Sequence, residues 1–424
     1  MFLLSFTVLY GLIFSNYHSF LFLINEVSVY NLFTFNTFYF PFIYIFLLIT
    51  ILTLFFCFAY NRSELLYFSI YVLFILFAGL GLFFTNSIFI FFLFYEALLI
   101  PSFLILYNYA KTRKCIEAAY LMFFWTQFGA LFLIFNFIYL FFITQSIFFN
   151  TFFFSSFSQF QLNFLLITII IGFGVKFPIW PFYDWLPKAH VEASTNFSIF
   201  LSGVLVKFAF FGFFKYLLNL QIEPTLTFIY PFFLIGIVDA SSKVYYQIDL
   251  KKLIAYATVI EMHWLLIAII NGQSVLWLAA FCMLISHALL SSNFFLLIDA
   301  VTRRFKTRLV TEINGLYYLN PKLYFILLLL LITFLGFPGS IFFISEFLFF
   351  AFLLDFNFLF FLVLIFILYF FVISCFFKNW FYLLFGYNFY FMNNKFIVDL
   401  DLKEIILFIY FILFLFWLGF SHQF

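Results

Sequence analysis

Long apolar segments separated by short polar connections make up almost the whole chain. A helix that crosses a bilayer needs about 20 predominantly apolar residues, and this length divides the sequence into about thirteen predicted spans. The longest polar connection lies near 300–321, which leaves no room for a soluble domain. We therefore predict an all-α fold, a polytopic bundle of transmembrane helices. The predicted spans are 2–24, 41–60, 64–85, 87–109, 115–143, 161–190, 194–220, 226–247, 252–270, 273–299, 322–352, 357–385 and 403–420.

Lysines and arginines gather in every second connection, as at 111–114 and 303–308. The charged residues of the other connections are all acidic, such as Glu26. Basic residues mark the cytoplasmic-type side of a membrane protein. The alternation therefore predicts an odd number of spans, with the N-terminus on the positive, matrix-like side and the C-terminus on the opposite side. We expect Lys188 and His190 to meet solvent on the positive side.

The composition indicates that lipid, not water, surrounds most of this bundle. Hydrophobic residues are 67% of the 424 and charged residues only 8%, against about 25% charged in soluble domains. The 86 phenylalanines indicate T-rich codons, as in an AT-rich organellar genome. The first apolar run is too long for a cleavable signal. The four cysteines stand in separate segments, so we predict neither a disulfide framework nor a metal site, and no cofactor in this chain.

A few ionisable residues lie inside the predicted spans. A charge at the bilayer centre costs about 2.5–3.5 kcal/mol on insertion scales, so such residues face the bundle interior and mark ion or proton pathways. Alternatively, such residues only hold the helices together by static hydrogen bonds or ion pairs. This structural explanation becomes weaker when several ionisable residues lie on separate spans. Lys215 lies near a span end, where we predict that its ammonium reaches the headgroups. The residues at membrane depth are Glu96, Lys176, Lys207, Glu261, His263, His287 and Glu346.

Two of the predicted spans contain helix breakers beside a charge. Pro178 and Pro181 follow Lys176, and the segment GFPG (336–339) precedes Glu346. Proline removes a backbone donor and clashes with the preceding turn. Irregular backbone at membrane depth is tolerated only where protein or a wet cavity covers it, and discontinuous helices mark the ion-handling sites of transporters. We predict two discontinuous helices, each with a functional ionisable residue.

The segments around these residues resemble a known family. WLPKAHVEA (185–193) is long and ungapped, and VKFP (175–178) lies shortly before it. They resemble the antiporter-like subunits of mitochondrial NADH:ubiquinone oxidoreductase (complex I), and the PKAH form is similar to the subunit 4 family rather than to sister subunits 2 and 5. The resemblance covers about residues 87–350. The other matching segments are FYEALLIPSF, FFWTQFGA, LSGVLVKFAFFG, DLKKLIAYATV, ISHALLSS and GFPGSIFFISEF.

The resemblance implies a proton relay through five residues. Glu96 matches the acid that pairs with Lys176 on the first broken helix. Lys207 matches the central lysine, His287 the next relay group, and Glu346 the terminal acid from which the proton leaves. The implied function is proton translocation across the inner mitochondrial membrane, driven by NADH-to-ubiquinone electron transfer in other subunits.

The resemblance also implies inverted repeats and partners. Other membrane-arm subunits, above all the antiporter-like subunits 2 and 5, are the implied partners. The basic segment 303–308 is itself expected to bind either phospholipid headgroups or a partner subunit, and no nucleic acid is predicted. The family usually has fourteen spans, so one is expected to be lost on the N-terminal side. The predicted parts are 1–86 (N-terminal spans), 87–220 (first repeat, broken helix at 161–190), 226–354 (second repeat, broken helix at 322–352) and 355–424 (C-terminal spans).

The chain departs from the family pattern at two positions. Glu261 stands where the family usually has histidine, and Ser194 where it has proline. We hypothesise that Glu261 either replaces the histidine as a relay group or pairs with a nearby cation. Two other functions stay open: a subunit of a multi-subunit sodium/proton antiporter, and a structural membrane subunit that has lost pumping, against which the five matched residues argue. No quinone site is predicted.

Overall fold

The computed structural model describes residues 32–33, 39–55, 62–110, 112–152, 157–220, 229–313, 315–353, 359–386 and 398–421. Their regular structure is helical, apart from three isolated β-bridges. Within this described part, nine helices are long and apolar enough to cross a membrane, and three shorter apolar helices accompany them. The predicted all-α, multi-pass bundle is therefore confirmed. The exact number of spans stays a prediction, and the predicted span 2–24 lies outside the described residues.

Contacts divide the chain into two compact units. The first comprises the described residues of Met1–Pro178, Phe182–Trp185 and Glu192–Leu226; the second has Ile179–Pro181, Leu186–Val191 and those of Thr227–Phe424. The chain thus changes unit several times just after Lys176. The predicted division into repeats stays a prediction.

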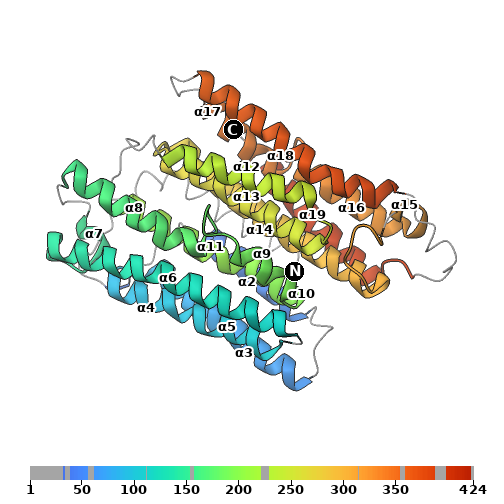
Figure 1. The fold of residues 1–424 in the computed structure, drawn as a ribbon, viewed down its shortest axis with the longest axis horizontal. Coiled ribbons are helices and arrows are strands. Elements are labelled where there is room, and N and C mark those ends of the chain that lie inside the picture. The colour runs from blue at the N-terminus through green and yellow to red at the C-terminus, as the bar shows by residue number, and fades with distance from the viewer. Residues whose placement is uncertain are drawn as a thin grey trace. The chain divides into compact units, whose positions relative to one another are not determined.

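In the first unit, α6 lies along α8 and α5, and α3 packs on α4 and α5 (Figure 1). Helices α6 and α8 approach closely at Gly129, where an added Cβ would lie 2.7 Å from the carbonyl oxygen of Gly172. Small residues allow such close approach between helices in lipid. The helices are α2 (Phe40–Phe55), α3 (Arg62–Phe84), α4 (Ile88–Ala97), α5 (Leu99–Asn108), α6 (Arg113–Thr144), α7 (Phe149–Phe152), α8 (Gln159–Lys176), α10 (Thr195–Phe200), η3 (Leu201–Leu205) and α11 (Val206–Leu220).

In the second unit, α13 packs between α12 and α14, and α17 packs on α14 and α19 (Figure 1). The short helix α9 (Trp185–Glu192) begins and ends in the first unit, but its middle, Leu186–Val191, belongs to the second. The remaining helices are α12 (Tyr230–Tyr246), α13 (Leu250–Ile270), α14 (Ser274–Phe305), α15 (Leu316–Leu319), α16 (Pro321–Phe334), α17 (Ile341–Leu353), α18 (Leu359–Phe385) and α19 (Leu402–Ser421).

Lys215 does not reach the headgroups, so that prediction was wrong. Its side chain is buried, and its ammonium donates to the carbonyl oxygens of Phe83 at 3.0 Å and Leu82 at 3.3 Å, and to that of Thr85. These carbonyls lie at the end of α3, where an α-helix leaves acceptors without intrahelical donors and where a cation is favoured by the helix dipole. Lys215 therefore caps α3.

We expect Lys215→Met to lower the stability of the chain by about 1–3 kcal/mol, because buried carbonyls would lose their donor. The check is the midpoint of thermal unfolding of the purified protein in detergent. Lys188→Met is the control, because Lys188 is exposed. Equal midpoints for the two variants would contradict the cap.

His190 is also placed differently from the prediction. Lys188 is exposed as expected, but His190 is fully buried and stacks on Phe295 with ring centroids 4.7 Å apart. His190 lies on α9, within Leu186–Val191 of the second unit. Its ring packs against Phe295 of the same unit and is therefore buried instead of facing solvent.

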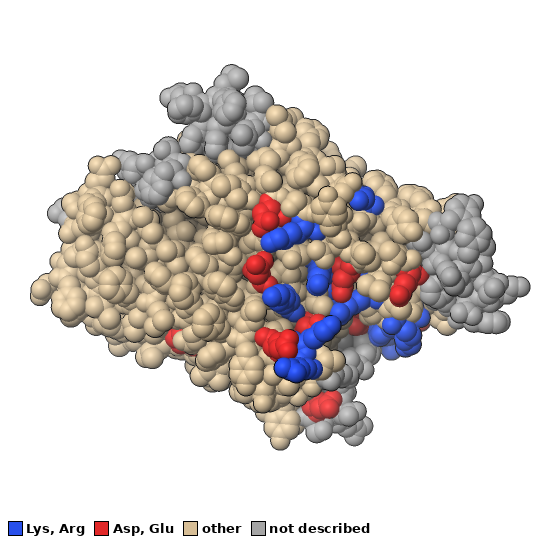
Figure 2. Space-filling model, viewed as in Figure 1, with Lys and Arg blue, Asp and Glu red and all other residues tan. Residues whose placement is uncertain are grey.

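Basic and acidic side chains lie close together on the face shown in Figure 2. Arg304 pairs with Glu404 at 2.5 Å, Arg303 with Asp299 at 2.9 Å, and Arg308 with Asp249 at 2.7 Å. The basic segment 303–308 is thus partly neutralised by acids of its own chain.

Candidate functional site

The first discontinuous helix ends at a lysine. In α8 the last regular hydrogen bond runs from Phe177 N–H to the carbonyl of Phe173, and helical structure resumes only at Trp185. Pro178 cannot donate to the helix, so the sequence itself ends α8 at Lys176. This confirms the predicted break.

Side chains take over the backbone groups that the break releases. In a continuous helix, the N–H of residue i bonds the carbonyl of residue i−4, so Ile179 would bond Val175 and Trp180 would bond Lys176. Instead, the Trp185 indole Nε1 donates to the Val175 carbonyl at 2.7 Å. The Trp180 N–H donates to His263 Nε2 at 2.9 Å.

Lys176 is buried beside the end of α4. Its side chain is 2% exposed; its Nζ donates to the carbonyl oxygen of Tyr95 at 2.8 Å and lies 3.7 Å from the centroid of the Tyr95 ring. A carbonyl near a helix C-terminus and an aromatic face both favour a cation. The break thus holds the ammonium against a carbonyl and an aromatic face, two contacts that offset part of the cost of burying its charge.

Glu96 lies next to this lysine but is held by another residue. Its Oε2 accepts a hydrogen bond from Gln127 Nε2 of α6 at 2.7 Å, and it interacts electrostatically with Lys176. Within the described residues the two charges form no direct ion pair. The structure therefore brings Glu96 and Lys176 together as neighbours, with a different partner for each.

Lys207 follows a widened helical turn. Residues Leu201–Leu205 form a π-helix, and the Lys207 ammonium, fully buried, donates to the carbonyl of Ser202. A π-bulge displaces backbone hydrogen bonds and is frequent at functional sites. Apart from Gly203, nothing in the residues around this turn indicates a π-helix, and the feature was not predicted.

The second discontinuous helix breaks between Phe334, the end of α16, and Ile341, the start of α17. Gly336 and Gly339 have φ of 68° and 96°, values that favour glycine. A Cβ on Gly336 would collide with the carboxylate of Glu346. The predicted break is confirmed, and its glycine makes room for the acid.

Glu346 and Glu261 line the same cavity, of about 30 Å³. One water occupies about 10–15 Å³ in such measures, so this space suits about two waters. The Tyr369 hydroxyl of α18 donates to Glu346 Oε1 at 2.6 Å, and Tyr369 also interacts electrostatically with Glu261. The two acids therefore lie in one cavity, and the Tyr369 side chain interacts with both of them.

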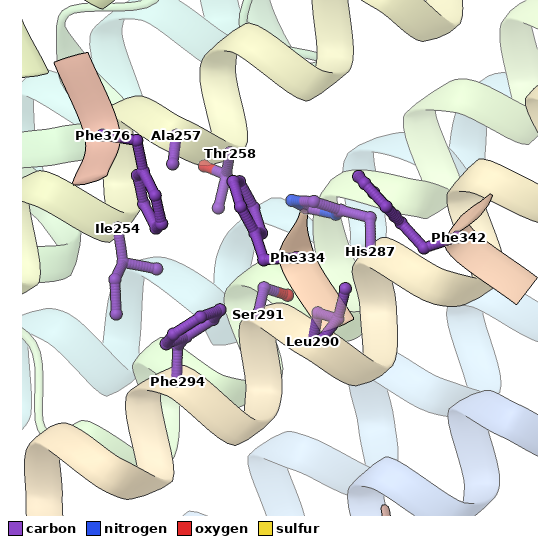
Figure 3. A pocket seen from close by; sticks show the side chains of 10 residues that line it. All are labelled: Ile254, Ala257, Thr258, His287, Leu290, Ser291, Phe294, Phe334, Phe342 and Phe376. Carbon is purple, nitrogen blue, oxygen red and sulfur yellow. The ribbon is translucent and has the colours of Figure 1, made fainter. Parts of the chain in front are cut away.

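His287 lies on α14 in a second, smaller cavity of about 10 Å³, which Figure 3 shows. Thr258 and Ser291 also line it, and the rest of its wall is apolar. Phe334 lines this cavity and also the one with the two acids. The cavity of His287 and the cavity of the two acids thus have one lining residue in common.

Three side chains that contact residues at the two helix breaks were not predicted as functional. Gln127 donates a hydrogen bond to Glu96, and Tyr369 donates one to Glu346. His263, which accepts from the Trp180 N–H, was noted only as an ionisable residue at membrane depth. Gln127 gave a signal, as an amide inside an apolar span, but Tyr369 is one of 27 tyrosines and nothing in its neighbourhood singles it out. Among the described residues, no group of three or more His, Cys, Asp or Glu could hold a metal ion.

The sequence matches a family described as NADH:quinone oxidoreductase/Mrp antiporter, TM, over residues 85–372. NADH-ubiquinone oxidoreductase chain 4 of Paramecium tetraurelia is 35% identical over 326 residues, covering 77% of this chain and 69% of that one. The chain 4 proteins of Acanthamoeba castellanii and Marchantia polymorpha are 30% and 34% identical, over 72% and 68% of this chain. This chain spans only 63% and 58% of those two relatives.

Two solved structures have a similar fold. A chain of the membrane-bound sulfane sulfur reductase, an archaeal respiratory complex, superposes with a TM-score of 0.80 at 21% identity, covering 98% of this chain and 70% of that one. A chain of the Mrp complex from Dietzia sp. DQ12-45-1b gives 0.71 at 20% identity, over 82% of this chain and 38% of that one. At these identities the likeness concerns the fold alone.

Proposed function

Because the chain belongs to the NADH:quinone oxidoreductase/Mrp antiporter membrane family, we propose that it is the antiporter-like subunit 4 of a respiratory NADH:ubiquinone oxidoreductase. In this role it carries protons across the membrane and contains no redox centre. Electron transfer from NADH to ubiquinone in other subunits supplies the energy. The observation that carries the proposal is the placing of an ionisable group beside each of the two helix breaks, the buried Lys176 and the half-buried Glu346.

The proposed switch lies at the first break. Glu96 has two possible partners, the Gln127 amide that it bonds and the Lys176 ammonium beside it. When the carboxylate approaches Lys176, it stabilises the charged lysine; when it returns to Gln127, the ammonium more readily gives up its proton, because burial disfavours a charge without a countercharge. A change in the electrostatics of the membrane arm would move Glu96 between these positions.

The proposed relay continues through Lys207 and His287 to Glu346, in the order that the resemblance implies. Burial of Lys207, and the position of His287 in a cavity that Thr258 and Ser291 help to line, support these roles. The cavity shared by Glu261 and Glu346 supports a role for Glu261 at the end of the relay, where it replaces the usual histidine as a second proton acceptor.

The chain is a multi-pass membrane protein, and we place it in the inner mitochondrial membrane with its N-terminus on the matrix side. Its proposed partners are the other membrane-arm subunits, above all the antiporter-like subunits 2 and 5. Lys306, exposed in the basic segment 303–308, is the proposed contact for phospholipid headgroups.

A subunit of a multi-subunit sodium/proton antiporter is the second candidate, because the same family includes Mrp antiporters. Gentle purification of the native complex separates the two. Co-purification with flavin and iron–sulfur subunits, together with NADH-driven proton uptake by reconstituted vesicles, supports complex I. A complex without redox subunits, which exchanges sodium for protons, would contradict it.

Glu261→Gln is expected to lower the number of protons taken up per NADH oxidised while leaving NADH oxidation by artificial acceptors unchanged. Gln keeps the size of the side chain but cannot carry a proton. The measurement is proton uptake by vesicles that contain the purified complex. Unchanged pumping would remove Glu261 from the relay and leave it as a structural acid.

A further inference from the structure

We infer that His263 is a positioning residue, whose neutral imidazole holds the first discontinuous helix open immediately after Lys176. The consequence for proton transfer rests on the proposed function, whereas the geometry stands on its own. His263 lies on α13, is fully buried, and contacts the irregular backbone that follows α8.

The two ring nitrogens of His263 have opposite roles. Nε2 lies 2.9 Å from the Trp180 N–H, which can only donate, so Nε2 must be an acceptor without a hydrogen. Nδ1 lies 2.7 Å from the Val259 carbonyl, which can only accept, so Nδ1 must carry the hydrogen. Both bonds exist together only in one tautomer of the neutral ring. A protonated ring has no acceptor and would lose the bond to Trp180.

The bond to Trp180 replaces a helical one. In a continuous helix the Trp180 N–H would donate to the carbonyl of Lys176, four residues earlier. His263 takes this donor, and so opposes extension of α8 past Lys176. Pro178 removes one backbone donor and blocks the helix sterically, but it does not bind the Trp180 N–H. His263 adds an attractive contact that holds this N–H away from α8.

Helix α12 fixes the ring in this orientation. A Cβ on Gly236 would lie 2.6 Å from His263 Cδ2 and 2.9 Å from the Cβ of Trp180, so only glycine leaves space for both. Phe233 approaches the ring edge to face, with centroids 6.4 Å apart. The imidazole is thus placed by packing and by two hydrogen bonds, which is what a positioning residue requires.

A competing role is that His263 itself carries protons in the relay. The two roles require different properties of the side chain: positioning requires a hydrogen-bond acceptor, whereas a relay requires a group that titrates. Gln has an acceptor oxygen at about the distance of Nε2 and does not titrate, whereas Leu has a similar size and no acceptor. These two variants therefore separate the roles.

The experiment compares His263→Gln and His263→Leu in the purified native complex, reconstituted into vesicles. We expect His263→Leu to lower this subunit's share of the proton uptake per NADH by about fivefold or more, in line with the cost of an unmade buried hydrogen bond. His263→Gln is expected to keep most of the uptake. Loss of uptake in His263→Gln as complete as in His263→Leu, with both complexes assembled, would overturn the inference in favour of a relay role.

Hydrogen–deuterium exchange of the peptide that contains Trp180 gives a readout independent of pumping. We expect faster exchange of this backbone amide in His263→Leu and near-native exchange in His263→Gln. Equal exchange in the wild type and His263→Leu would overturn the inference. If the wild-type complex takes up no protons on NADH oxidation, the proposed function fails, while exchange still decides the role of His263. Assembly of His263→Gln but not of His263→Leu supports the need for an acceptor.

Discussion

Lys176→Met is expected to reduce the protons taken up per NADH oxidised by at least the one that this subunit carries. Met retains the length and apolar contacts of the lysine stem but removes the group that holds and releases the proton. A positioned proton carrier typically contributes about 10²–10⁴-fold to the rate of transfer, so flow through this subunit should fall by at least about a hundredfold. Proton uptake by reconstituted vesicles, measured beside NADH oxidation, is the check.

Lys215→Met is the matched control for this prediction. Both lysines are buried, and both donate to carbonyls near a helix end, Lys176 to Tyr95 and Lys215 to Phe83. Only Lys176 has an acid beside it and a broken helix after it. Lys215→Met should therefore lower thermal stability and keep the proton ratio. Equal loss of pumping in both variants would show that any buried amine removed from the first unit disrupts the protein.

The contrast between these two lysines shows what the sequence could reveal. Apolar length located the long described helices, and prolines or glycines located both breaks, because these signals are local in the chain. Lys215 was misplaced because its partners, the carbonyls at the end of α3, are more than 100 residues away. Which helix end a lysine reaches depends on packing, and no local pattern encodes it.

The same reasoning applies to the acids. Resemblance pointed to Glu96 and Glu346, but their direct partners are Gln127 and Tyr369, which are uncharged and lie on other helices. The meeting of Glu261 and Glu346 in one cavity likewise depends on the packing of α13 against its neighbours. The sequence thus indicated which ionisable groups lie inside the spans, and the tertiary structure was needed to show what holds each of them.

Glu346→Gln is expected to have the second large effect, slowing proton release at the end of the relay. Gln preserves the acceptor for the Tyr369 hydroxyl, so the local hydrogen bond survives while the carboxylate is lost. Glu261 lines the same cavity and can take part of the proton traffic. We therefore expect the proton ratio to fall further in Glu346→Gln than in Glu261→Gln, and to fall by the subunit's full share in the double variant.

The double variant makes the shared cavity testable, because residues of one site show non-additive effects. If Glu261 and Glu346 serve one exit, either acid partly covers for the other, and the double variant loses more than the two single losses together. Tyr369→Phe is the control for orientation: it removes the hydrogen bond to Glu346 and leaves both carboxylates, so it should slow pumping without abolishing it. Strictly additive losses in the double variant would show that the acids work independently, and full pumping in Glu346→Gln would exclude the second helix break as the exit.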